Sequence, residues 1–430
     1  MKHTPLRLNV AIVLLSFLCD AGASVILATQ SRPAQDGTKL VESAKKANLR
    51  QFETILASGV DVNARSTDGE TALAAAAAEH KNHDEMVELL LERGARFDER
   101  SLGSAAIWVD VSFGFHNHPM PSYSFRCGNS IFEMAPEYRK SDRIGVTPLL
   151  VAANSGNSRI VERLLARGAD IHALTFEGAT ALMLATIAND VASIEMLLRK
   201  GADVNAAATK GQTALMLASW SDATNRGPSR IDAVQLLVNA GANIDARDAE
   251  GRSALVGAAK ADNREAAEFL LNNGSDVNAT SIKGRTALME AADAGNVEMM
   301  RLLLSRGADA NVKDNEGKTA LMDAAFLNRK PEAVAVLLEA GASIKEKADG
   351  QSVTPLLIAE LAQSDDAIRL LKQAGASLSD NEALILAAHR AQTERVKSLL
   401  EKGADANARG VRGKPVLAYA AMTDHPESRE

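Results

Sequence analysis

The chain has 430 residues, of which 46% are hydrophobic and only 3% are aromatic. Its formal net charge of −7 argues against binding to nucleic acid or to anionic lipid through bulk positive charge. A single globular core of this length would divide into several domains, whereas a repeat array in which each unit is buried by its neighbours need not.

The N-terminal residues have the pattern of a secretory signal. Lys2 and Arg7 give a positive start, Val10 to Cys19 is an apolar run too short to span a bilayer, and Ala21-Gly22-Ala23 supplies small residues for cleavage. We therefore expect a signal peptide at 1–23, a leader at 24–35, and a periplasmic or secreted protein. The signal carries a net charge of +1, so its removal changes −7 to −8. The competing interpretation is a buried first helix. No later apolar segment of about 18 residues follows, so no membrane insertion of the mature chain is expected.

A repeated pattern begins near Asp36. The stretch 283–312 contains Gly-x-Thr-Ala-Leu, a Gly-Asn turn, a Leu-rich segment and Gly-Ala-Asp. A similar pattern begins again at Glu316. A glycine that can end a helix in the left-handed conformation recurs, often at intervals of 33 or 34 residues. These glycines are Gly59, Gly94, Gly168, Gly201, Gly241, Gly274, Gly307, Gly341, Gly375 and Gly403.

This period and the Thr-Ala-Leu or Thr-Pro-Leu signature resemble the ankyrin repeat family. The resemblance implies an all-α ankyrin-repeat solenoid of about ten helix–turn–helix units with short β-hairpin fingers. We expect an N-terminal cap and a repeat at 36–98, repeats at 145–408, and a C-terminal cap and tail at 409–430. The family often has His in the signature, but this chain has apolar residues there: Leu150, Met183, Met216, Val256, Met289, Met322 and Leu357. Apolar packing is therefore expected to replace the hydrogen bond of that His.

An aromatic-rich insertion at 99–144 interrupts the period and holds seven of the fifteen aromatic residues. Alternating apolar residues at 107–115 and again at 123–127 predict one β-hairpin whose loop carries Pro119 and Pro121. The insertion could pack on neighbouring helices, contact a partner, or, least favoured, bind metal through His116, His118 and Met120. Cys127 remains either a buried small side chain or a reactive thiol.

The sequence contains no zinc-protease, nucleophile-elbow or phosphate-loop motif, so we expect no enzymatic activity, no cofactor and no metal. Ankyrin arrays act as binding surfaces, and the resemblance implies a concave face formed by the fingers and by the residues that follow each Ala-Ala pair. Apolar and basic residues at these variable positions have the profile of interface anchors. The predicted partner-binding residues are Phe176, Ile187, Trp220, Arg252, Lys260, Ile282, Arg285, Lys318, Phe326 and Leu327.

We therefore expect a monomeric scaffold in the cell envelope of a bacterium that binds another protein or a peptide segment. The alternatives are a secreted effector that binds a host protein and, less favoured, a metal- or redox-linked envelope protein. The competing interpretation of the aromatic residues is that they pack on a neighbouring repeat.

Overall fold

The structure is a computed structural model that describes residues 35–79, 83–98, 100, 124–127, 130–133, 146–220, 231–326, 330–348 and 353–421. The predicted signal peptide and nearly all of the leader lie outside these residues, as do His116, His118, Met120 and Leu327. Backbone contacts divide the chain into a first unit that ends at Thr209 and a second unit that begins at Lys210.

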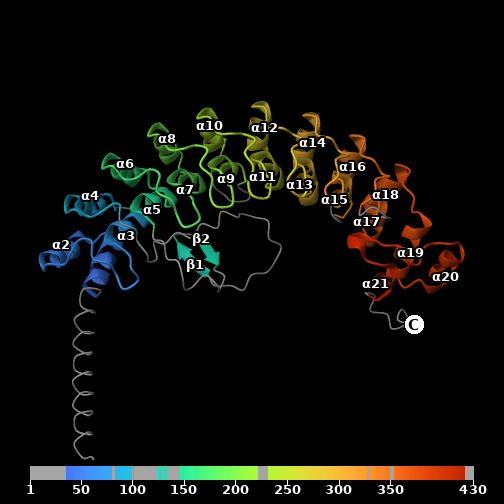
Figure 1. Cartoon of the computed structure of the whole chain (residues 1–430), viewed down its shortest axis with the longest axis horizontal. Helices are drawn as coiled ribbons and strands as arrows, with labels where there is room; N and C mark the ends of the chain where they lie inside the picture. Colours follow the sequence, from blue (N-terminus) through green and yellow to red (C-terminus); the bar gives the residue numbers. More distant parts are fainter. Residues whose placement is uncertain are drawn as a thin grey trace, which may run out of the picture. The chain divides into compact units, whose positions relative to one another are not determined.

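The first unit stacks pairs of antiparallel helices, and each pair packs on the next (Figure 1). The first helix of each pair lies in one row and the second in another. The helices are residues 35–45, α2 (Leu49–Ala57), α3 (Ala72–Ala78), α4 (Asp84–Glu92), α5 (Pro148–Asn154), α6 (Ser158–Ala166), α7 (Ala181–Ile187) and α8 (Val191–Arg199).

The second unit continues the same pairing over six pairs and ends in a single helix (Figure 1). Its helices are α9 (Ala214–Ser219), α10 (Ile231–Asn239), α11 (Ala254–Lys260), α12 (Arg264–Asn272), α13 (Ala287–Ala294), α14 (Val297–Ser305), α15 (Ala320–Phe326), α16 (Pro331–Glu339), α17 (Pro355–Leu361), α18 (Asp365–Gln373), α19 (Asp380–His389), α20 (Thr393–Glu401), the 3₁₀ turn η2 (Val411–Gly413) and α21 (Val416–Ala421). The predicted ankyrin-type solenoid is confirmed.

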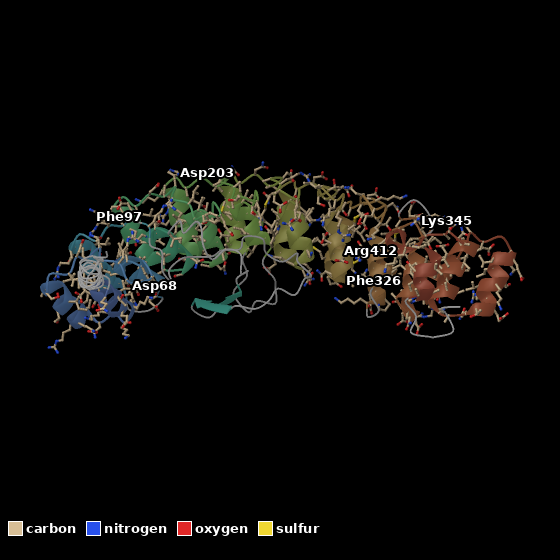
Figure 2. All side chains as sticks on the ribbon, turned by 60° about the horizontal axis from the view of Figure 1, so that its bottom comes forward. Asp68, Phe97, Asp203, Phe326, Lys345 and Arg412 are labelled. Atoms are coloured by element: carbon tan, nitrogen blue, oxygen red, sulfur yellow. The ribbon has the colours of Figure 1, made fainter. Side chains whose placement is uncertain are left out.

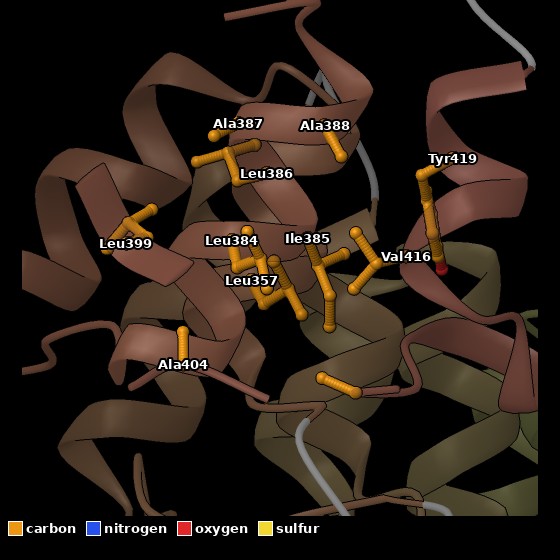
Figure 3. Packing of buried hydrophobic residues seen from close by; sticks show 11 residues of the cluster. Leu357, Leu384, Ile385, Leu386, Ala387, Ala388, Leu399, Ala404, Val416 and Tyr419 are labelled. Atoms are coloured by element: carbon orange, nitrogen blue, oxygen red, sulfur yellow. The ribbon is translucent and has the colours of Figure 1, made fainter. Parts of the chain in front are cut away.

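The C-terminal half-unit closes the second unit. Helix α21 packs against α19, and its Val416 and Tyr419 are buried beside Ile385 (Figure 3). Leu417, on the same helix, is 78% exposed. The last helix therefore covers the preceding pair, as expected for a terminal cap.

The insertion leaves the stacking of the first unit intact. Helix α5 packs directly on α3, and α6 packs on α4. Across this junction Ser155 Oγ donates to the Ala78 carbonyl at 3.0 Å, and Arg163 pairs with Glu88 at 3.0 Å. The repeats before and after the insertion are therefore neighbours in space.

Within the insertion, strand β1 (Ser124–Cys127) pairs antiparallel with β2 (Ser130–Glu133). We predicted a strand at 123–127, but paired with 107–115 across the proline-containing loop. The partner of β1 is β2, and residues 107–115 lie outside the described part of the chain. The sequence contains a reason for this pairing, because only Gly128 and Asn129 separate the two strands, and Gly-Asn favours a two-residue hairpin.

Helix ends follow the predicted glycine pattern. All ten of the glycines that follow the second helices have φ between 80° and 93°, a conformation in which other residues are strained. The space around each is open, because a Cβ would meet nothing within 4 Å. Backbone conformation alone, and not crowding, therefore explains these glycines.

Helix starts follow the predicted pattern with one exception. The Thr or Ser before a first helix accepts a hydrogen bond from the backbone three residues later, as Thr286 does from Met289 N at 3.3 Å. Thr319 is 1% exposed, yet its hydroxyl has no hydrogen-bond partner. The apolar residues that replace the family's His are all buried, with Met289 and Met322 each 1% exposed. Apolar packing therefore takes the place of the family's His in these repeats, as predicted.

We use the word finger for the loop that joins the second helix of one pair to the first helix of the next. The fingers contain isolated antiparallel bridges, such as Leu174 with Thr180, and hydrogen-bond to one another, as Ile282 N does to Glu250 O at 2.9 Å. Asn278 joins two fingers, since its side chain donates to Gly307 O at 3.2 Å and accepts from Asp309 N at 2.9 Å. Asn278 therefore serves the repeat itself, by holding two successive fingers together.

Candidate binding face

The candidate site is the surface that the fingers and first helices of the second unit share, which we call the finger face. Two positions of each of the helices α9, α11, α13, α15 and α17 contribute to it, four and seven residues after the capping Thr or Ser. The four-residue positions are Leu217, Gly257, Glu290, Asp323 and Ile358, and the seven-residue positions are Trp220, Lys260, Asp293, Phe326 and Leu361.

Trp220 does not lie exposed on this face. It is 7% exposed, its Nε1 donates to Ser253 O at 3.2 Å, and its indole covers Gly257. A Cβ placed on Gly257 would fall 1.6 Å from the Trp220 Cδ1 atom. The prediction of an exposed anchor at Trp220 is wrong, because the missing side chain of Gly257 leaves a site for the indole on the next repeat.

Arg252 is likewise buried instead of exposed at a fingertip. Its guanidinium carbon lies 5.0 Å from the Trp220 ring centroid, a cation–π distance. It also pairs with Asp248 at 2.6 Å and with Glu250 at 3.2 Å. Arg252 therefore holds the Trp220 indole in place, and its predicted role as an exposed contact is wrong.

Arg285 bridges two successive repeats. Its Nε lies 2.5 Å from Glu290 Oε1 and its Nη1 lies 3.0 Å from Asp323 Oδ2. A second carboxylate of the next repeat, Asp314, lies 3.7 Å from the same Nη1. Burial alone would lower the pKa of Arg285, but Asp323 and Glu290 outweigh it and hold that pKa above its usual value. The arginine side chain is mostly buried, at 17% exposure, so its predicted role as an open basic contact is wrong.

The remaining basic candidates also have acidic partners. Lys260 is half-buried and its Nζ lies 3.6 Å from Glu290 Oε2. Burial lowers the pKa of Lys260 in spite of Glu290 and Asp293. Lys318 pairs within its own finger with Glu316 at 2.6 Å, and this contact lowers the pKa of Glu316. Neither lysine is a freely exposed positive charge.

Three of the apolar candidates are exposed. Phe326 at the end of α15 is 67% exposed and extends away from the ribbon (Figure 2). Ile282, at the tip of the finger before α13, is 66% exposed. In the first unit, Phe176 at a fingertip is 45% exposed, whereas Ile187 at the end of α7 is half-buried. In the second unit, the exposure of the large apolar side chains of Ile282 and Phe326 is the property expected of a protein-binding surface.

The sequence reasoning missed the acidic residues of this face. Glu290, Asp314 and Asp323 surround Arg285, and burial raises the pKa of Asp323 to about 7 against the opposing effect of Arg285. The sequence did contain a signal for this cluster. At the position four residues after the capping residue, two successive repeats have Leu217 and Gly257, and the next two have Glu290 and Asp323. Charged residues in a mostly buried column require nearby counter-charges.

The described residues hold no group of three His, Cys, Asp or Glu side chains arranged to bind a metal ion. In the same part of the chain, no helix has the length and hydropathy needed to cross a bilayer. The side chains of the loop histidines and of Cys127 are outside this part.

Comparison with known proteins agrees with the repeat geometry. The family model for three-copy ankyrin repeats matches in overlapping blocks that together run from residue 132 to 382, and the single ankyrin repeat model matches 68–101 and 379–411. No curated protein matches the chain.

Among solved structures, the human ASB11 ankyrin repeat domain is 25% identical, with 54% of this chain and 100% of that chain covered and a TM-score of 0.47. The ankyrin repeat domain of Bcl-3, a member of the IkappaB family, is 29% identical, with 53% and 98% covered and a TM-score of 0.44. Both TM-scores are below 0.5, so membership rests on the family models, which match more than half of the residues. The chain belongs to the ankyrin repeat family.

Proposed function

We propose that this protein is a non-enzymatic scaffold that binds another protein or peptide segment through the finger face of its ankyrin array. The observation that carries the proposal is the exposure of Phe326 and Ile282, at 67% and 66%, on a face where Trp220 is buried and Arg285 is ion-paired. Burying such side chains against a partner would contribute roughly 25 cal/mol for each Å² of apolar surface.

The binding residues in this proposal are revised from the sequence-based set. Ile282 and Phe326 remain as candidate contacts on the finger face, and Phe176 remains a candidate contact on a finger of the first unit. Lys260 and Lys318 are retained because part of each side chain is accessible. The proposal no longer includes Trp220, Arg252 and Arg285, because these side chains support the array itself.

The proposed location is the bacterial cell envelope or the medium, and the proposed state is monomeric. The location is supported by the signal-like pattern of residues 1–23. Fractionation of the native organism would test it: a full-length chain retained in the cytoplasm, with residues 1–23 uncleaved, would contradict the location without affecting the binding proposal.

The binding proposal can be tested by cross-linking capture from an extract of the native organism. We compare the wild-type protein, the double variant Ile282→Ala/Phe326→Ala, and a control, Leu400→Ala. Leu400 is a 40% exposed apolar residue on α20, which is a second helix and lies outside the finger face.

A partner of the finger face would be captured by the wild type and by Leu400→Ala but lost from the double variant. The melting temperature of the double variant should stay close to that of the wild type, because substitutions of exposed side chains usually change stability by less than about 0.5 kcal/mol. Equal capture by all three proteins would contradict the assignment of this face.

A further inference from the structure

The charges between α13 and α15 do not balance. Three carboxylates, Glu290, Asp314 and Asp323, lie 2.5–3.7 Å from the single guanidinium of Arg285. On the preceding repeat, Lys260 pairs with Glu290, with its Nζ 3.6 Å from Oε2. Asp314 and Asp323 therefore share one positive charge.

Asp323 is the carboxylate placed to respond to this excess. It lies in the middle of α15, where its side chain is 12% exposed, so water screens it poorly. Asp314 is also buried, but its Oδ1 accepts hydrogen bonds from Glu316 N and Lys318 N at 2.9 Å each. Glu290 has both Arg285 and Lys260 as partners. Of the three carboxylates, Asp323 therefore has the fewest polar contacts among the described residues.

Among the described residues, no cation other than Arg285 pairs with Asp323, and Lys330, which lies just before α16, donates instead to Gly295 O at 2.8 Å. On α13, the charged neighbours are Glu290 and the exposed Asp293. On α17, Glu360 is occupied by Lys372 at 2.8 Å and by Arg390 at 3.0 Å. The fingers contribute Arg285, Asp314 and the mutually paired Glu316 and Lys318, and the charged residues of α16 are the exposed Glu332 and Glu339. Burial accordingly raises the pKa of Asp323 to about 7.

We propose that the interface between α13 and α15 is a proton-sensitive joint, in which one proton taken up by the Asp323 carboxylate stabilises the packing of the two repeats. The unfolded chain binds this proton only near pH 3.8, the ordinary value for Asp, and the folded chain binds it near pH 7. The stabilisation is therefore fully present below the unfolded pKa, declines as pH rises from about 4, and is lost above about 7.

The joint would also regulate binding, a consequence that depends on the proposed function. Phe326 follows Asp323 by three residues on α15 and so lies on the same side of the helix, one turn away. A change in how firmly α15 packs on α13 would then change the position of Phe326, a proposed contact residue. The following test needs no partner, so its failure would be distinct from a failure of the binding proposal.

The test is urea unfolding of the full chain at pH 5.5, 6.5, 7.5 and 8.5 for the wild type, Asp323→Asn and a control, Asp366→Asn. Asp366 is also paired with an arginine, Arg369 at 2.6 Å, but its side chain is 59% exposed. In the wild type, loss of the Asp323 proton should lower the folding equilibrium constant by up to tenfold for each unit of rising pH until about pH 7, with no further fall above it. Asp323→Asn should lack this part of the pH dependence. Asp366→Asn should keep the wild-type profile.

Identical pH profiles for the wild type and Asp323→Asn would overturn the proposal. If Asp323→Asn does not fold, carboxyl NMR of the wild type labelled with ¹³C at its aspartates decides the question. One aspartate titrating near pH 7 is the expected result, and the absence of any aspartate titrating above pH 5 would equally overturn the proposal.

Discussion

The contact between Trp220 and Gly257 predicts that Gly257→Ala destabilises the protein when Trp220 is present and stabilises it when Trp220 is replaced by Ala. Trp220→Ala removes a buried aromatic side chain, and such changes cost about 3–5 kcal/mol. Gly257→Ala puts a methyl group where the indole lies, 1.6 Å from its Cδ1 atom, so the indole must leave. The loss of its burial is offset only by about 1 kcal/mol from the better helix propensity of Ala. Gly257→Ala should therefore destabilise the protein by about 2–4 kcal/mol.

In the Trp220→Ala background the same substitution has no indole to displace. Gly257→Ala should then stabilise the protein by up to about 1 kcal/mol, giving a coupling of about 2–5 kcal/mol between the two sites. The assay is urea unfolding of the four proteins followed by circular dichroism. Tryptophan emission adds a local measurement, and a Trp108→Phe background leaves Trp220 as the only tryptophan. If Gly257→Ala proves as stable as the parent with unchanged emission, the proposed packing is incorrect.

Three smaller predictions use the same unfolding assay. Ala391 has φ of 53°, so Ala391→Gly should stabilise the protein by about 0.5–1 kcal/mol; a loss of stability would contradict the idea of strain there. Asn311 donates to one carbonyl of the next finger and accepts from Ser343 N at 2.7 Å. Asn311→Ala should therefore lower the free energy of unfolding by about 1–3 kcal/mol. A loss below about 0.5 kcal/mol would show that Asn311 does not join the two fingers. Thr286→Ala should cost about 1 kcal/mol, but Thr319→Ala should cost less because the Thr319 hydroxyl has no partner; equal costs would show that capping is not the cause.

Features that repeat along the chain could be predicted from the sequence. Each helix-ending glycine, each capping Thr or Ser except Thr319, and each apolar residue at the position of the family's His serves its own repeat in the same way, so one repeat predicts the others. Met183 and Met216 illustrate this, since both are 1% exposed as the pattern requires. In a repeat array the environment of a consensus position recurs with the period.

The variable positions could not be predicted one at a time. Whether Trp220 is exposed depends on the residue at position 257 in the following repeat, and the position of Arg285 depends on Asp323, 38 residues later. These contacts join non-equivalent positions of adjacent repeats. A rule that assigns exposure from the position within the repeat alone therefore fails for them. Phe326 and Ile282 were assigned as exposed correctly because no neighbouring residue covers most of their side chains.

The direct packing of α5 on α3 has a consequence for how this family can diversify. A long excursion of the chain between two stacked pairs adds only loop-closure entropy, and each doubling of its length costs only about 0.6 kcal/mol. Growth from an ordinary finger to the segment at 99–144 amounts to roughly two doublings, which is small beside the stability of a typical fold. The length of this segment can therefore change at little cost to the stacking of α5 on α3.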